Sequence, residues 1–250
     1  MILFTKRSTI LPMVDELVNR SLPRENPKGK PNAFQTAPRR MPVEMRERHI
    51  VDGAIQFFAR HGFDAQLRDL AKSIGVTHTL LYHYFPTKQA LVDRVYQEVF
   101  EGRWKPEWET WLDDATLNAE DKFTLFYVDY ADTVLTYDFV RILIFSGLTD
   151  QTITNRFFEL LRKRLFPRLI RETRHYRQLN SRARPTASEH ELLMGLHGSI
   201  FYSGLRRWVY SQAVHSASLK AYDKIAIRNQ VRSYLQASKT LLTKEKPLWH

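Results

Sequence analysis

From Met45 to the carboxyl terminus, apolar side chains recur almost everywhere at the three- and four-residue spacing of an α-helix. Ile50, Ala54 and Phe58 begin this pattern at i, i+4 and i+8. No alternating strand pattern and no hairpin turn interrupts it. The sequence therefore predicts an all-α fold in which a small amino-terminal unit precedes a larger helical body.

The first 42 residues differ in composition from the rest of the chain. Proline removes backbone hydrogen-bond donors and resists helix formation. Residues 1–42 are therefore expected to be a flexible basic extension, either a disordered tail or an arm that touches phosphate or a minor groove. The prolines that mark it are Pro23, Pro27, Pro31, Pro38 and Pro42.

Composition excludes several classes of site. The chain has no cysteine, which excludes a disulfide framework and a thiolate zinc site. No apolar run approaches the roughly 20 residues that a membrane helix needs, and no Gly-rich phosphate loop, nucleophile elbow or paired-histidine zinc motif is present. We therefore expect a cytoplasmic, nucleoid-associated protein that is not an enzyme, has no cofactor or metal, and has no membrane partner.

Turn signals divide residues 62–87 into short helices. Gly62 is placed to end the first helix, and Asp64 is the expected cap of a second helix that runs to about Ile74. Gly75 and Val76 form a tight turn, after which Thr77 caps a third helix that ends near Phe85. Thr87 caps a fourth. Helices joined by so few residues must cross one another, as in a helix-turn-helix.

The motifs of this segment form one continuous pattern. They are Ala54, Phe57 and Phe58, Gly62-Phe63, Arg68-Asp69-Leu70-Ala71, Gly75-Val76-Thr77, Leu81-Tyr82-His83-Tyr84-Phe85 and Thr87-Lys88-Gln89-Ala90-Leu91. In order and spacing, residues 46–100 resemble the TetR family of bacterial regulators. The segment departs from the family pattern in being one residue short between Gly62-Phe63 and Leu70-Ala71, and in having Asp64 where a Ser or Thr cap is usual.

The resemblance implies a set of DNA-contacting residues, because a helix-turn-helix places its second helix in the major groove. His78 and Thr79 are expected to read base edges, and Leu80 either meets a thymine methyl or packs inward. Tyr82 and Lys88 are expected to bind phosphate. Thr77 caps the helix, touches phosphate or does both, and Tyr84 is expected to face outward. The alternative is that Tyr82 to Phe85 form an ordinary aromatic core cluster.

Regulators of this type are dimers, and two long carboxyl-terminal helices suit that role. Small residues let another helix approach closely, so we expect a dimer interface there; the alternative is close packing within one subunit. The expected interface residues are Gly195, Gly198, Ser199, Ser203 and Gly204, with Ile227, Val231 and Tyr234 on the last helix.

Aromatic residues crowd the middle helices and indicate either a packed core or an apolar pocket for a small apolar or amphipathic effector. Arg141 is expected to pair with an anionic ligand or with an aspartate. The candidate pocket residues are Phe126, Tyr130, Arg141, Phe145 and Phe158.

Residues 162–184 are rich in arginine and indicate a solvated face, or a surface that touches flanking DNA or lipid.

Together these features predict a helix-turn-helix DNA-binding domain at 43–102 and a helical effector-binding and dimerisation domain at 103–250. The expected function is that of a sequence-specific transcriptional regulator, a ligand-responsive repressor that binds a palindromic double-stranded operator as a homodimer. The alternative is a non-specific architectural DNA-binding protein without an effector. Net charge does not decide between these two functions. The chain carries a net charge of +11, but the charges within residues 41–103 sum to zero, so the excess lies outside the predicted DNA-binding segment.

Overall fold

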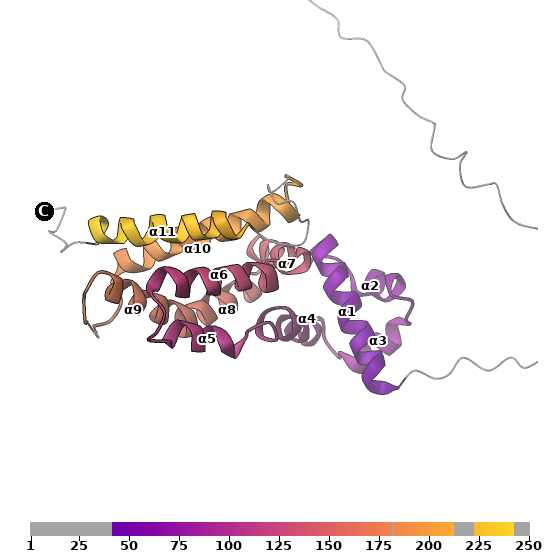
Figure 1. Ribbon diagram of the computed structural model, residues 1–250. Coiled ribbons are helices and arrows are strands. Elements are labelled where there is room, and N and C mark those ends of the chain that lie inside the picture. Colours follow the sequence, from indigo (N-terminus) through magenta and orange to yellow (C-terminus); the bar gives the residue numbers. More distant parts are fainter. Residues whose placement is uncertain (1–41, 182, 213–222, 243–250) are drawn as a thin grey trace, which may run out of the picture. The chain divides into compact units, whose positions relative to one another are not determined.

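The structure is a computed structural model that describes residues 42–181, 183–212 and 223–242 (Figure 1). Within these ranges every regular element is helical, which confirms the predicted all-α fold. The first elements are α1 (Val43–His61), α2 (Leu67–Ser73), α3 (His78–Tyr84), α4 (Lys88–Tyr96) and a π-helical turn, η1 (Gln97–Glu101). They are followed by α5 (Pro106–Asp113), α6 (Ala119–Val134), α7 (Tyr137–Gly147), α8 (Thr152–Leu160), the π-helical turn η2 (Leu161–Leu165), α9 (Phe166–Tyr176), α10 (Ala187–Trp208) and α11 (Lys224–Leu241).

The predicted extension, residues 1–42, lies outside the described residues except for Pro42. The described residues all belong to one compact unit.

Two predicted threonine caps are confirmed. The Thr77 hydroxyl accepts the Leu80 amide at 3.1 Å, and the Thr87 hydroxyl accepts the Ala90 amide at 3.0 Å. Each satisfies one of the free amides of a first helical turn, which fixes where α3 and α4 begin.

The predicted cap of the second helix was wrong. α2 begins at Leu67, so the cap position falls on Gln66, whose side chain makes no capping hydrogen bond. Asp64 lies outside the helix and is exposed. The cap position therefore lies two residues beyond Asp64, and this carboxylate makes no capping hydrogen bond to α2.

Gly62 ends α1 as predicted, with a φ of +75° that side chains rarely adopt. A Cβ at this position would lie 3.0 Å from Cδ1 of Phe145 on α7. Glycine at position 62 therefore permits both the positive φ of the turn and the close approach of α1 to α7.

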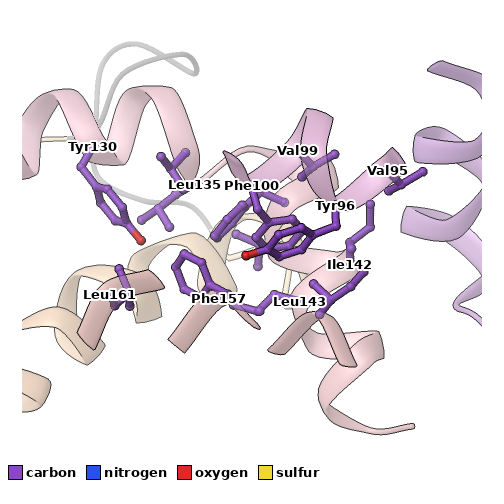
Figure 2. Packing of buried hydrophobic residues seen from close by; sticks show 14 of the residues in the cluster. Val95, Tyr96, Val99, Phe100, Tyr130, Leu135, Ile142, Leu143, Phe157 and Leu161 are labelled. Carbon is purple, nitrogen blue, oxygen red and sulfur yellow. The ribbon is translucent and has the colours of Figure 1, made fainter. Parts of the chain in front are cut away.

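The hydrophobic core is continuous from α4 into the later helices (Figure 2). Tyr96 and Phe100 stack with ring centroids 5.2 Å apart, and Phe100 meets Phe157 of α8 edge-on at 5.7 Å. Leu143 of α7 is buried beside them. The α4–η1 helix is therefore anchored in the body of the protein as well as in the helix-turn-helix.

Two buried ion pairs connect the later helices. The Lys122 ammonium of α6 donates to Glu172 of α9 at 2.6 Å, and Arg174 of α9 donates to Glu189 of α10 at 2.6 Å. Each charge is matched at short range, which is the condition under which buried ions are tolerated. The last two helices, α10 and α11, lie side by side (Figure 1).

The arginine-rich stretch is not a bare basic face. Arg164 and Arg168 both bind Glu109 of α5, at 2.5 and 2.7 Å, and Arg171 binds Asp113 of the same helix. These pairs hold α5 against η2 and α9 and neutralise much of the positive charge. Neither of the two predictions for this stretch, a solvated face or a surface for DNA or lipid, anticipated this role.

No helix among the described residues is both long and apolar enough to cross a membrane.

Candidate nucleic-acid interface

The turn between α2 and α3 is fixed by backbone contacts and by α1. Gly75 has a φ of +70°, and the Val76 amide donates to the Ala71 carbonyl at 3.0 Å. The His49 side chain of α1 lies 3.0 Å, through Nε2, from the Ile74 carbonyl. α2 and α3 are thereby held at a fixed angle, as a helix-turn-helix requires.

Gly53 permits this packing and was not singled out from the sequence. A Cβ at this position of α1 would lie 2.3 Å from Cγ2 of Ile74, closer than any real contact. A glycine inside a helix pattern is a signal of close approach, and this one could have been recognised on that ground.

The two faces of α3 are chemically distinct. Leu81 is fully buried, and Phe85, directly after the helix, is 6% exposed. On the other face Tyr82 is 40% exposed, and its ring centroid lies 4.7 Å from that of His78. Thr79 is exposed as well. The predicted outward direction of His78, Thr79 and Tyr82 is therefore seen, and the aromatic residues do not form a single core cluster.

The remaining α3 positions refine the prediction. Thr77 is exposed and Leu80 is half-buried. Tyr84, expected to face outward, is half-buried and packs against the core, so its ring is only partly available. His83 is exposed and was not among the predicted contacts. An i, i+4 pattern anchored on Leu81 and Phe85 leaves position 83 on the outer side, so the signal was present.

Lys88, predicted to bind phosphate, is differently engaged. Its ammonium donates to the Phe63 carbonyl and, at 3.1 Å, to the Ala65 carbonyl. An ammonium has three donors, so one remains beyond these two bonds. In the structure Lys88 joins the start of α4 to the turn before α2.

The helix-turn-helix is joined to the body by cationic side chains. Nε of Arg141 on α7 donates to the Ala59 carbonyl near the end of α1 at 2.5 Å. The Arg156 guanidinium of α8 lies 3.8 Å from the centroid of the Tyr96 ring and binds Asp93 at 2.8 Å. A movement of α7 or α8 would therefore displace α1 and α4 through these contacts.

The five predicted pocket residues lie in different parts of the described chain, and their assignment to an effector pocket stays a prediction. Phe126 and Tyr130 are buried in a ring cluster with Trp108. Arg141 and Phe145, in contrast, lie where α7 meets α1. Phe158 contacts Phe157 on α8. The aromatic residues at Phe126 and Tyr130 are core residues. Helical periodicity alone does not distinguish a core position from a pocket position.

The same ring cluster encloses His197 of α10. Burial lowers the pKa of this imidazole to about 4. Its Nδ1 and the Tyr127 hydroxyl have no hydrogen-bond partner among the described residues. Burial also raises the pKa of Tyr127 well above its ordinary value. Both side chains are therefore neutral at physiological pH.

The predicted dimer residues separate into two groups. Gly195 and Gly198 of α10 are exposed, and a Cβ on either would meet nothing within 4 Å. Ser199 and Ser203 are half-buried. The other four, which are buried within the chain and cannot form an interface as predicted, are Gly204, Ile227, Val231 and Tyr234.

The stripe on α11 is buried because α6 and α9 cover it. Tyr234 stacks on Phe123 at 5.8 Å and shares a hydrogen bond of 2.8 Å with Thr173. What α10 and α11 do present is a groove of about 450 Å³, lined by Gly195 and Ser199 on one side and by Ser233 and Ala237 on the other.

Comparison with known proteins confirms the resemblance inferred from the motifs. Residues 50–95 match the family model described as bacterial regulatory proteins, tetR family. A search of curated proteins gave no match.

Solved structures of TetR-type regulators share the fold. A TetR-family transcriptional regulator from Streptomyces coelicolor is 16% identical with a TM-score of 0.55, covering 81% of this chain and 85% of its own. A TetR-like regulator from Rhodococcus sp. RHA1 is 17% identical with a TM-score of 0.56, covering 82% and 100%. The TetR-family regulator PfmR from Thermus thermophilus is 17% identical with a TM-score of 0.54, covering 75% and 97%. The likeness extends beyond the helix-turn-helix into the helical body.

Proposed function

We propose that this chain, which carries the helix-turn-helix of the TetR family on a TetR-type fold, is a sequence-specific DNA-binding transcriptional regulator. One observation carries the proposal: α3 buries Leu81 on one face and presents His78 and Tyr82 on the other, behind a threonine-capped start. A helix that is anchored on one side and polar on the other is suited to enter a major groove.

Each exposed α3 residue has a proposed role. His78 and Thr79 read base edges, Tyr82 donates its hydroxyl to a phosphate, and Thr77 uses its hydroxyl hydrogen in the same way while its oxygen caps the helix. Leu80 and Tyr84 border the contact through their exposed edges. Two of the three N–H donors of Lys88 bind carbonyls, and the third is available to a phosphate.

We also propose that two chains pair through the exposed strip of α10 and the facing edge of α11. A two-fold dimer presents two copies of α3 to half-sites about 34 Å apart, which makes the preferred site a palindrome. The open surface over Gly195 and Gly198 supports this, because nothing in the chain covers it among the described residues. The protein would then act at the nucleoid.

Repression that responds to a ligand is the third part of the proposal. It is supported by the contacts that join α1 and α4 to α7 and α8, through Arg141 and Arg156. A ligand that shifts either of these helices changes the spacing of the two recognition helices, and a small shift is enough to spoil register on DNA.

The test is selection of bound duplexes from a random library by the full chain. We predict a palindromic site and weaker enrichment of it by Tyr82→Ala, whereas Asn155→Ala, at an exposed position of α8, should keep the wild-type enrichment. Recovery of no preferred sequence, with equal binding by Tyr82→Ala, would instead support a non-specific architectural DNA-binding protein.

A further inference from the structure

A cavity of about 400 Å³ lies where the helix-turn-helix meets the body. One wall comes from the turn before α2 and the first residues of α4, the other from α7, α8 and the turn that joins them. Its volume falls in the range of roughly 300–1,000 Å³ that small-molecule sites occupy. None of the residues predicted from the sequence for an effector pocket lines it.

The apolar part of the lining is firmly held. Phe63 packs on Phe58 with ring centroids 5.0 Å apart, and Val92 and Ile153 are 8% and 1% exposed. Next to them the Ser146 hydroxyl is buried and accepts the amides of Ile153 and Thr154 at 3.1 and 3.3 Å. This surface is therefore a preformed apolar platform.

The charged side chains of the lining carry a net negative charge, because two aspartates are present with one lysine. Asp64 comes from the wall of the helix-turn-helix and Asp150 from the wall of the body. Neither carboxylate has an ion-pair partner among the described residues; Asp150 accepts only the Thr152 amide, at 3.1 Å. Lys88 also lines the cavity, but its ammonium is directed to the Phe63 and Ala65 carbonyls.

We propose that this cavity binds a small organic cation with an apolar body. The ammonium would lie with the Asp64 and Asp150 carboxylates, and the apolar part would cover Phe63, Val92 and Ile153. A neutral ligand leaves the two carboxylates unmatched, and an anion meets their repulsion.

The position of the cavity gives binding a consequence for DNA, a step that rests on the proposed function. A ligand that contacts both Asp64 and Asp150 fixes the start of α4 relative to the α7–α8 turn. The geometry of α3 on DNA follows α4, so occupancy changes operator affinity.

The binding test uses the full chain without DNA and is therefore independent of the proposed function. The probe is phenethylamine, compared by calorimetric titration with neutral phenethyl alcohol and anionic 3-phenylpropanoate. We expect the amine to bind at least fivefold more tightly than the alcohol, and Asp64→Asn or Asp150→Asn to abolish this preference. Glu107→Gln, an exposed acid on α5, serves as the control and should keep it. Absence of amine binding, or equal affinity for the three compounds, would overturn the proposal.

A second measurement locates the site. The chain has no cysteine, so Thr149→Cys places a single thiol on the cavity wall. Phenethylamine should slow alkylation of this thiol by iodoacetamide at least threefold and leave alkylation of Asn155→Cys, at an exposed position of α8, unchanged. Equal rates with and without the amine in Thr149→Cys would place the binding elsewhere and contradict the assignment.

The regulatory step is measured separately, as operator affinity with and without saturating amine. We expect a change of at least threefold in the wild type and none in Asp150→Asn. Amine binding at the cavity with unaltered operator affinity would refute regulation from this site. Failure to find any preferred DNA would refute the proposed function while leaving the binding result intact.

Discussion

Tyr82 places its hydroxyl on the open side of α3, where a phosphate can reach it. We predict that Tyr82→Phe lowers affinity for DNA by about 1–2 kcal/mol and does so equally for all sequences, because a phosphate contact carries no sequence information. His78→Ala should instead relax the preference at one base position. Fluorescence anisotropy with single-base variants of the selected site separates the two effects. Tyr82→Phe binding as tightly as the wild type would contradict the assigned role.

Gly62 combines a positive φ with close contact to Phe145. We predict that Gly62→Ala lowers the free energy of unfolding by about 1–2 kcal/mol, since alanine is strained at this φ and its Cβ crowds the ring. Gly147→Ala is the matched control, because a Cβ there meets only Thr154 Oγ1 at an ordinary 3.6 Å. Urea denaturation measures both. If Gly62→Ala were as stable as the wild type, neither the positive φ nor the contact with Phe145 would require glycine at this position.

His197 gives stability a dependence on pH. Its pKa in the folded chain is about 4, against about 6.5 in an unfolded chain. The unfolded state therefore takes up the proton first, so stability is full above pH 6.5 and declines as pH falls toward 4. The loss attributable to this residue approaches about 3 kcal/mol at pH 4.

Thermal melts across this range test that linkage. His197→Phe should lose most of the decline between pH 6.5 and pH 4, whereas His83→Gln on the exposed side of α3 should keep it. A decline of the same size in His197→Phe and the wild type would assign the pH dependence to other groups.

At the scale of elements, the Lys122–Glu172 pair is the most sensitive contact between α6 and α9. Both side chains are 6% exposed. Lys122→Met removes the buried partner of the Glu172 carboxylate and leaves it the Arg171 guanidinium, at 3.1 Å. We predict a loss of about 1.5–3 kcal/mol in unfolding free energy, the value of a hydrogen bond to a charged group. The double variant Lys122→Met/Glu172→Gln should recover a large part of this. No recovery in a double-mutant cycle would mean that the lysine acts through packing and not through charge.

Local chemistry determined the elements that the sequence predicted correctly. Thr77 and Thr87 cap helices through hydrogen bonds to residues three positions away, so their effect is readable within a few residues. Asp64 failed as a cap because the start of α2 depends on how the preceding turn packs, and the helix begins with its cap position two residues later, at Gln66.

Periodicity shows which side of a helix is apolar and not what covers it. The stripe of Ile227, Val231 and Tyr234 was assigned to a partner subunit but is covered by α6 and α9. The arginines of η2 and α9 were judged without α5, whose acids lie more than 50 residues earlier. The cavity beside α4 was unpredictable for the same reason, since its walls are distant in sequence.

For the whole molecule, the proposed pairing through α10 would double the DNA contact. We predict that Gly195→Arg and Ser199→Arg, which place long cations on the open strip, convert a dimer to a monomer by light scattering. Asn155→Arg on α8 should remain dimeric with unchanged melting temperature. Monomeric wild-type protein at micromolar concentration, or dimeric Gly195→Arg, would move the interface to another surface.

We infer that two copies of α3 read one palindromic site. The most direct measurement is anisotropy at fixed salt of the selected palindrome, the same duplex with one half-site scrambled, and a fully scrambled duplex. We predict two chains on each palindrome and an affinity at least about 10³-fold above that for the fully scrambled duplex. Scrambling one half-site should remove most of this advantage. Equal affinity for all three duplexes would contradict the account, because the protein would then hold DNA without reading it.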